Sequence, residues 1–218
     1  MPATTNCPQA SPGEEVANSI SHGVGAILSL AALVILVVLA AQGGTSYQVV
    51  AGAVYGTSLV LLFMCSTLYH ALTNERAKRV FRILDHCSIY VLIAGTYTPF
   101  TLVTLRGPWG WALFGVVWTL AVFGIVYKGL FTGRLHVLST MVYILMGWVV
   151  VVAIRPLLRA LPWQGFLWLL AGGVLYTLGV LFFMWHRKYS HTLWHFMVLA
   201  GSICHFFAVY RYVLSRRA

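Results

Sequence analysis

Residues 165–185 read GFLWLLAGGVLYTLGVLFFMW and contain no charged side chain. An α-helix rises 1.5 Å per residue, so a run of about 20 apolar residues spans the hydrocarbon core of a bilayer. Six further runs have a similar character, and the full set is 22–41, 47–69, 87–105, 109–127, 135–154, 165–185 and 193–214. Five glycines should let these helices approach one another closely: Gly52, Gly56, Gly172, Gly173 and Gly179. The sequence therefore predicts an all-α, polytopic integral membrane protein with seven transmembrane helices.

The composition of the whole chain agrees with this fold class. Of the 218 residues, 60% are hydrophobic and only 8% are charged, and the mean hydropathy is +0.86. A soluble domain of this size is about a quarter charged and needs polar groups to cover its outside. The composition excludes a soluble globular protein, a disordered chain and a disulfide-rich secreted scaffold. We expect residues 1–14 to form a flexible polar tail and residues 15–218 to form a single seven-helix transmembrane domain.

The net charge of +10 is concentrated in the connectors between apolar runs. Connectors on the side of the N-terminus carry Arg76, Lys78, Arg79, Arg82, Lys128, Arg134, Arg187 and Lys188. The opposite connectors carry Arg106, Arg155 and Arg159, and the C-terminal tail adds Arg211, Arg216 and Arg217. Basic residues gather on the cytoplasmic side of membrane proteins, so this asymmetry predicts a cytoplasmic N-terminus and a C-terminus outside. The same placement argues against a nucleic-acid partner.

Histidines are unevenly distributed in this topology. Seven of the eight lie at or near predicted helix ends on the N-terminal side: His22, His70, His86, His136, His186, His191 and His195. The eighth, His205, lies about 15 Å along the helix from His195, too far to share an ion with it. Histidines near an interface cost little, and His136 and His186 are interpreted as interface anchors. The concentration on one side still indicates a further role.

Three sequence elements at this membrane face favour a metal site. His191 and His195 are spaced i, i+4, which puts both imidazoles on one helix face. Ser66 and His70 share a face of the second helix, and Asp85 is the only acidic residue inside the apolar block. A single pair of histidines at this spacing is more often structural, but three converging elements favour a metal.

The chemistry of such a site is coherent. Three neutral imidazoles hold Zn²⁺ and leave a fourth position for a water molecule, whose pKa falls toward about 7. The Asp85 carboxylate is suited to take the proton of that water or to hold the water in place. Ser66 is interpreted as a hydrogen-bond donor to the groups around the metal ligands or as a stabiliser of a developing oxyanion. The alternative is that its hydroxyl bonds back to its own helix. His86 points about 100° away from Asp85 on a helix and is left out of the ligand set.

A second polar cluster precedes the first apolar run. Glu15, Asn18 and His22 are spaced i, i+3 and i+7, which is one stripe of a helix. The stripe is explained either by helix capping and amphipathic docking, or by a plug or lining at the mouth of the same site.

Together these motifs resemble the hemolysin III family, the bacterial branch of the progestin and adipoQ receptor superfamily. The family pattern Glu-x2-Asn-x2-Ser/Thr-His is met by Glu15, Asn18, Ser21 and His22. The other matching elements are Ser66 with His70, Asp85 near the start of the third helix, the stretch 94–99, and His191 with His195. The match runs from about Glu15 to the C-terminus.

The resemblance implies seven helices, a cytoplasmic N-terminus and a location in the bacterial inner membrane. It also implies a zinc ion bound by His70, His191 and His195 near the cytoplasmic leaflet. In receptor relatives the counterpart of Asp85 contacts the zinc-bound water, and ceramide hydrolysis is attributed to that site. Alkaline ceramidases carry a similar Ser/Asp/His set. The bacterial branch is named after the haemolytic activity of a few members.

Three functions are compatible with these features. The first is an intramembrane zinc hydrolase that acts on an amide or ester lipid, with membrane lipids as partners and one of them as substrate. The second is a haemolytic, pore-forming or membrane-perturbing protein. The third is a membrane sensor or regulator in which zinc only joins helices. The open fourth position and the neighbouring carboxylate favour the hydrolase.

Overall fold

The computed structural model describes residues 10–131, 136–185 and 187–215. Within them, seven helical segments are long and apolar enough to cross a membrane, and no strand occurs. They are α1 (Pro12–Ala41), α2 (Ser46–Ala71), α3 (Glu75–Pro99) continued by a π-helical turn (Phe100–Thr104), α4 (Pro108–Phe131), α5 (His136–Trp148) continued by a 3-10 turn (Val149–Ala153) and α6 (Ile154–Ala160), α7 (Trp163–Met184), and α8 (Ser190–Val209) continued by a π-helical turn (Tyr210–Leu214). The predicted all-α fold with seven spans is confirmed.

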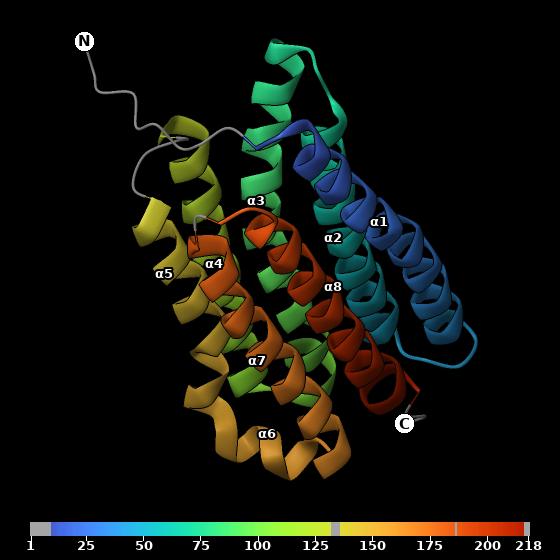
Figure 1. Cartoon of the computed structure of the whole chain (residues 1–218). Coiled ribbons are helices and arrows are strands. Elements are labelled where there is room, and N and C mark those ends of the chain that lie inside the picture. Colours follow the sequence, from blue (N-terminus) through green and yellow to red (C-terminus); the bar gives the residue numbers. More distant parts are fainter. Residues whose placement is uncertain (1–9, 132–135, 186, 216–218) are drawn as a thin grey trace.

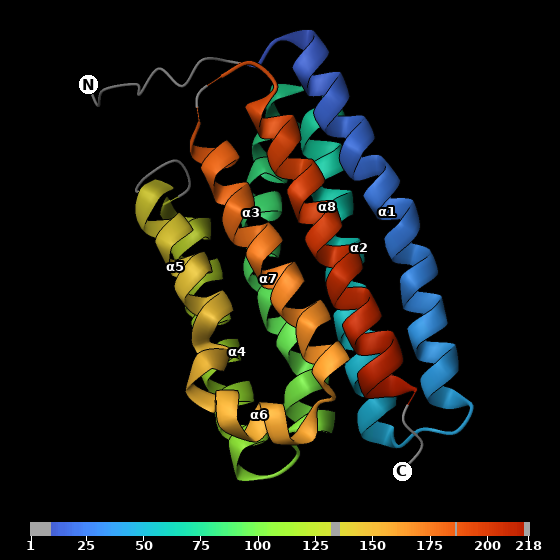
Figure 2. The same cartoon turned by 60° about the horizontal axis from the view of Figure 1, so that its bottom comes forward.

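The long helices run side by side as a bundle, and α6 lies across one end of it (Figure 1). Helices α1 and α8 begin at the opposite end from α6, which is also the end where α2 finishes (Figure 1). Figure 2 shows the same arrangement from a second direction, with α1 and α8 inclined together along one side of the bundle. The ends of α1, α2 and α8 therefore meet at one end of the molecule.

Helix α1 begins at Pro12, well ahead of the apolar run that starts at residue 22. Ser11 caps it: its hydroxyl accepts from the Glu14 N–H, and the Glu14 carboxylate accepts from the Ser11 N–H at 2.9 Å. This reciprocal capping box stabilises a polar first turn. Helix α1 thus includes the last residues of the predicted tail. The polar stripe of Glu15, Asn18 and His22 lies within this helix.

Helix α3 also starts earlier than predicted. Its N-cap is Asn74, whose side-chain oxygen accepts from the N–H groups of Arg76 and Ala77 at 3.1 Å. The basic residues expected in a connector, Arg76 to Arg82, therefore lie on the helix itself. Lys128, also expected in a connector, is buried within α4, and Arg134 lies outside the described residues. The early start places Asp85 about three turns into α3.

The fifth span is not the single helix that was predicted. Four consecutive valines, residues 149–152, form a 3-10 turn between α5 and α6, where β-branched side chains weaken the α-helix. Tyr97 of α3 compensates, because its hydroxyl donates to the Gly147 carbonyl at 2.7 Å and accepts from the Val150 N–H at 2.9 Å. Backbone groups freed inside a membrane protein need such partners.

Small residues allow close helix contacts at most of the predicted positions. A Cβ atom at Gly56 would lie 2.8 Å from the Leu33 Cα, and one at Gly172 would lie 2.2 Å from the His205 ring. Gly173 differs, because nothing lies within 4 Å of its hypothetical Cβ. The prediction of a close contact at Gly173 was wrong, and this residue lines a cavity instead.

Candidate metal centre

Three histidines from two helices meet at one end of the bundle. His70 lies in the last turn of α2, and His191 and His195 lie in the first two turns of α8. Each offers one ring nitrogen, and the three nitrogens all lie within 4.8 Å of one another. The ring centroids are 5.2 Å apart for His70 and His191, 5.0 Å for His70 and His195, and 4.7 Å for His191 and His195. His70 therefore forms one compact cluster with two histidines that follow it by more than 100 positions in the sequence.

The local backbone explains how these side chains come together. Helix α2 ends because Leu72 is extended, so His70 projects at the helix end. Before α8, Tyr189 adopts a left-handed conformation with φ 61°, which is unfavourable for a residue with a Cβ. The Tyr189 N–H donates to the Glu14 carboxylate of α1 at 2.9 Å. The chain thus turns sharply into α8 and presents His191 to α2.

The donor set fits a metal ion. Nε2 of His70 is buried and has no hydrogen-bond partner among the described residues. A buried polar atom left in this state costs free energy unless something binds it. Three imidazole nitrogens this close together are typical ligands of zinc and of other borderline transition metals.

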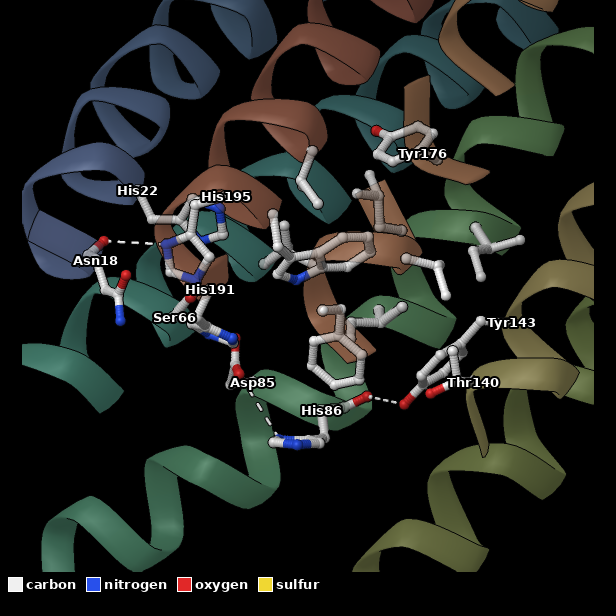
Figure 3. Close-up of a pocket in the computed structure, with 18 of the residues that line it drawn as sticks. Asn18, His22, Ser66, Asp85, His86, Thr140, Tyr143, Tyr176, His191 and His195 are labelled. Carbon is white, nitrogen blue, oxygen red and sulfur yellow. Dashed lines mark hydrogen bonds and ion pairs between the residues drawn. The ribbon is translucent and has the colours of Figure 1, made fainter. Parts of the chain in front are cut away.

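Ser66 and Asp85 lie beside this cluster. The Ser66 hydroxyl hydrogen-bonds to the Asp85 carboxylate, and His70 lies close to the same carboxylate. Both residues line the same cavity as the three histidines. Figure 3 shows them together on the side of the cavity that carries His191. The structure thus brings α2, α3 and α8 to a common point, as the sequence motifs predict.

Two other histidines, His86 and His205, make their own contacts away from this point. His86 Nδ1 lies 2.7 Å from the Arg82 carbonyl and 3.7 Å from the Asp85 carboxylate, on the far side of that carboxylate from His191 (Figure 3). His205 is buried deeper, and its Nε2 donates to the Leu169 carbonyl at 3.0 Å. The predicted anchors, the His136 side chain and His186, lie outside what the structure describes.

The polar stripe of α1 packs directly against the cluster. His22 stacks on His195, and the Asn18 side-chain oxygen accepts from the Thr192 hydroxyl at 2.6 Å. Glu15 lies 2.6 Å from Nδ1 of His70. Of the two explanations left open by the sequence, these contacts favour a lining at the site over simple capping. Lys78, whose Nζ lies 2.7 Å from Glu15, was not singled out by sequence reasoning.

A cavity of about 2850 Å³ extends from the histidine cluster into the bundle. It passes Trp194 and Val198 of α8 and reaches Tyr176 and His205, and side chains of α3, α5 and α7 form its other walls. Figure 3 shows the histidines at one side of this space and Thr140 and Tyr143 of α5 across it. The candidate metal centre therefore stands at the polar end of a large, mainly apolar chamber.

Comparison with known proteins places the chain in a family. The family model described as "Haemolysin-III related" matches residues 11–206. Hemolysin-3 of Bacillus cereus is 52% identical over 92% of both chains, and the Hemolysin-3 homolog of Bacillus subtilis is 46% identical over 93% of this chain and 95% of the relative. The human monocyte to macrophage differentiation factor is 26% identical over 92% of this chain and 84% of its own. No solved structure matches the chain. The protein is a multi-pass bacterial membrane protein and belongs to the haemolysin-III-related family.

Proposed function

We propose that the protein binds a zinc ion through His70, His191 and His195 and hydrolyses an amide or ester bond of a membrane lipid. One observation carries this proposal: three convergent imidazoles stand at the head of a cavity whose walls are mainly apolar. A zinc ion held by three imidazoles supplies Lewis acidity and makes a water molecule nucleophilic at neutral pH. The buried, unpartnered Nε2 of His70 supports the presence of a ligand at this point.

In this proposal Asp85 is the general base. Its carboxylate lies beside the histidine cluster and accepts a hydrogen bond from Ser66, which restricts its orientation. A carboxylate held in that way is suited to take the proton of the attacking water and to return it to the leaving group. Ser66 is proposed to position the carboxylate, because its hydroxyl is already engaged with Asp85.

The cavity supports a lipid as the substrate. Sites for drug-sized ligands usually enclose about 300–1,000 Å³, and this cavity is well above that range. Apolar residues such as Val198 and Leu169 line its deeper part, where an acyl chain would bury its methylene groups. The polar head of the lipid would then lie at the histidine cluster.

A second candidate is a regulator in which the metal has only a structural role. His70 comes from α2 while His191 and His195 come from α8, so a bound ion would join two helices that are distant in sequence. Metal removal would then lower the stability of a protein that cleaves no lipid with or without the metal. Haemolysis, the activity in the name of the Bacillus cereus relative, is a third outcome that the same preparation can test.

The test is hydrolysis of ceramide-like and ester lipids by the full-length protein in nanodiscs, with zinc content measured in parallel. The proposal expects zinc-dependent release of a fatty acid by the wild type and none by His195→Ala. Zinc-loaded protein that cleaves no lipid in a broad panel but unfolds on chelation would favour the regulator. Lysis of red cells by zinc-free protein would favour cytolysis.

A further inference from the structure

We propose that α1 is a template for the metal centre: it fixes which ring nitrogen of His70 and His195 faces the metal, and Glu15 is the positioning residue for His70. This inference rests on the proposed zinc site. It concerns the chain's own residues, and it assigns a role to the polar stripe that the proposed reaction leaves unexplained.

The contact between Glu15 and His70 defines the tautomer of His70. Glu15 Oε2 lies 2.6 Å from His70 Nδ1. A carboxylate can only accept a hydrogen bond, so the proton of the neutral ring belongs on Nδ1. The lone pair then belongs to Nε2, the atom that is buried and has no hydrogen-bond partner among the described residues. The hydrogen bond also fixes the ring plane.

His195 is oriented in the same way by the backbone of α1. Its Nδ1 lies 3.2 Å from the Asn18 carbonyl (Figure 3). The same nitrogen lies 3.1 Å from the Ser21 hydroxyl. The Ser21 hydroxyl donates to the Asn18 carbonyl at 2.9 Å, which leaves its oxygen free to accept. Both neighbours therefore act as acceptors, and the proton of His195 also belongs on Nδ1. Nε2 is then the nitrogen left for a metal.

Lys78 of α3 pairs with the oxygen of Glu15 that does not contact His70. Its Nζ lies 2.7 Å from Glu15 Oε1, so each carboxylate oxygen has its own partner. The Lys78 side chain is 31% exposed, whereas that of His70 is only 4% exposed. The ion pair faces the aqueous end of the bundle and the histidine faces inward. Glu15 thus connects α1, α2 and α3 at one side chain.

Such outer partners are known to tune metal sites. A carboxylate that accepts from a metal-bound histidine fixes its tautomer and raises its basicity, and its loss typically costs about 10–100-fold in metal affinity. Glu15→Gln keeps the length of the side chain and removes the charge. Its amide can also donate to Nδ1, which would favour the wrong tautomer of His70.

The experiment measures zinc affinity by competition with a chromophoric chelator, using the full-length protein in nanodiscs. Glu15→Gln should weaken zinc binding by about 10–100-fold. Glu75→Gln is the matched control, because this carboxylate is exposed in the first turn of α3 and has no part in the site. Lys78→Met removes the ion pair and leaves the carboxylate on His70, so both controls should bind zinc nearly as tightly as the wild type.

A second measurement reads the tautomer without any metal. In chelator-stripped protein carrying ¹⁵N-labelled histidine, NMR correlations between ring nitrogens and ring protons should place the His70 proton on Nδ1, with His70→Ala identifying the signal. Glu15→Gln should give a mixture of tautomers. Wild type that takes up no zinc but shows this tautomer would defeat the proposed function and leave the template role standing. Unchanged affinity and tautomer in Glu15→Gln would overturn the template role, as would an equal loss of affinity in Lys78→Met.

Discussion

The imidazole of His22 lies parallel to that of His195, with ring centroids 3.5 Å apart and an angle of 11° between the planes. Phe63 of α2 meets His22 edge-on at 4.9 Å, so the ring of His22 is held between α2 and α8. Both nitrogens of His22 are buried and have no hydrogen-bond partner among the described residues. The contact of His22 with His195 is therefore one of ring packing.

Two replacements of His22 should show whether the shape of its ring or the polarity of its nitrogens matters for stability and zinc binding. His22→Ala removes the stacked ring and should lower the free energy of unfolding by on the order of 2 kcal/mol, because it leaves a cavity beside His195. His22→Phe keeps a flat ring and removes two unpartnered nitrogens, so stability and zinc affinity should stay near wild type. Thermal unfolding measures the stability of each variant, and chelator competition measures its zinc affinity. Loss of zinc in His22→Phe would show that a nitrogen of His22 is needed.

The neighbouring glycines of α7 provide a test of the packing. Gly172→Ala would place a methyl group 2.2 Å from the His205 ring, so the midpoint of thermal unfolding should fall by several degrees. Gly173→Ala meets nothing within 4 Å and replaces glycine by a better helix former, so the midpoint should stay the same or rise. Equal destabilisation by the two substitutions would contradict the packing of α7 on α8.

Much of this architecture could be predicted from the sequence, because it depends on local patterns. Span lengths follow from runs such as residues 165–185, and an even number of crossings brings His70 and His191 to the same end of the bundle. The break after α5 could not be predicted, because Tyr97, which satisfies it, lies about 50 residues away. The local signals were the valine run and Pro156, whose nitrogen cannot donate to the carbonyl of Val152.

The sequence predicted the histidines of the site but not the contacts that α1 makes with them. The spacing of His191 and His195 indicates a shared face, since helical geometry is local. The contacts of Glu15 depend on how α1 inclines against α2 and α8, and no periodicity in the sequence encodes that angle. Its spacing with Asn18 and His22 showed that a stripe exists, but not what the stripe touches.

The predicted orientation can be tested with cysteines in a background without the four native ones. The basic residues of α3 still lie at the end of the bundle that carries the histidines, so this end should face the cytoplasm. Thr73→Cys and Lys188→Cys, both exposed positions at that end, should resist an impermeant maleimide added to intact cells. Arg159→Cys at the opposite end should react. The reverse pattern would place the histidine cluster outside.

The role of Asp85 is tested by a substitution that keeps its shape. Asp85→Asn removes the proposed base but none of the three histidines, so zinc should stay bound and the protein should stay folded. Lipid turnover should fall by about 10²–10⁴-fold, the usual contribution of a general base. Zinc content, thermal unfolding and fatty-acid release are measured on the same sample. Full turnover by Asp85→Asn would remove this residue from the reaction.

The metal content of the purified protein tests the central claim most directly. Inductively coupled plasma mass spectrometry should find one zinc per wild-type chain and little in His70→Ala, His191→Ala or His195→Ala, since each removes one of three ligands. His205→Ala is the matched control, because this buried histidine bonds to the Leu169 carbonyl, away from the cluster, and it should keep its zinc. One zinc per chain in all three ligand variants would contradict the account, and so would a wild-type protein without bound metal.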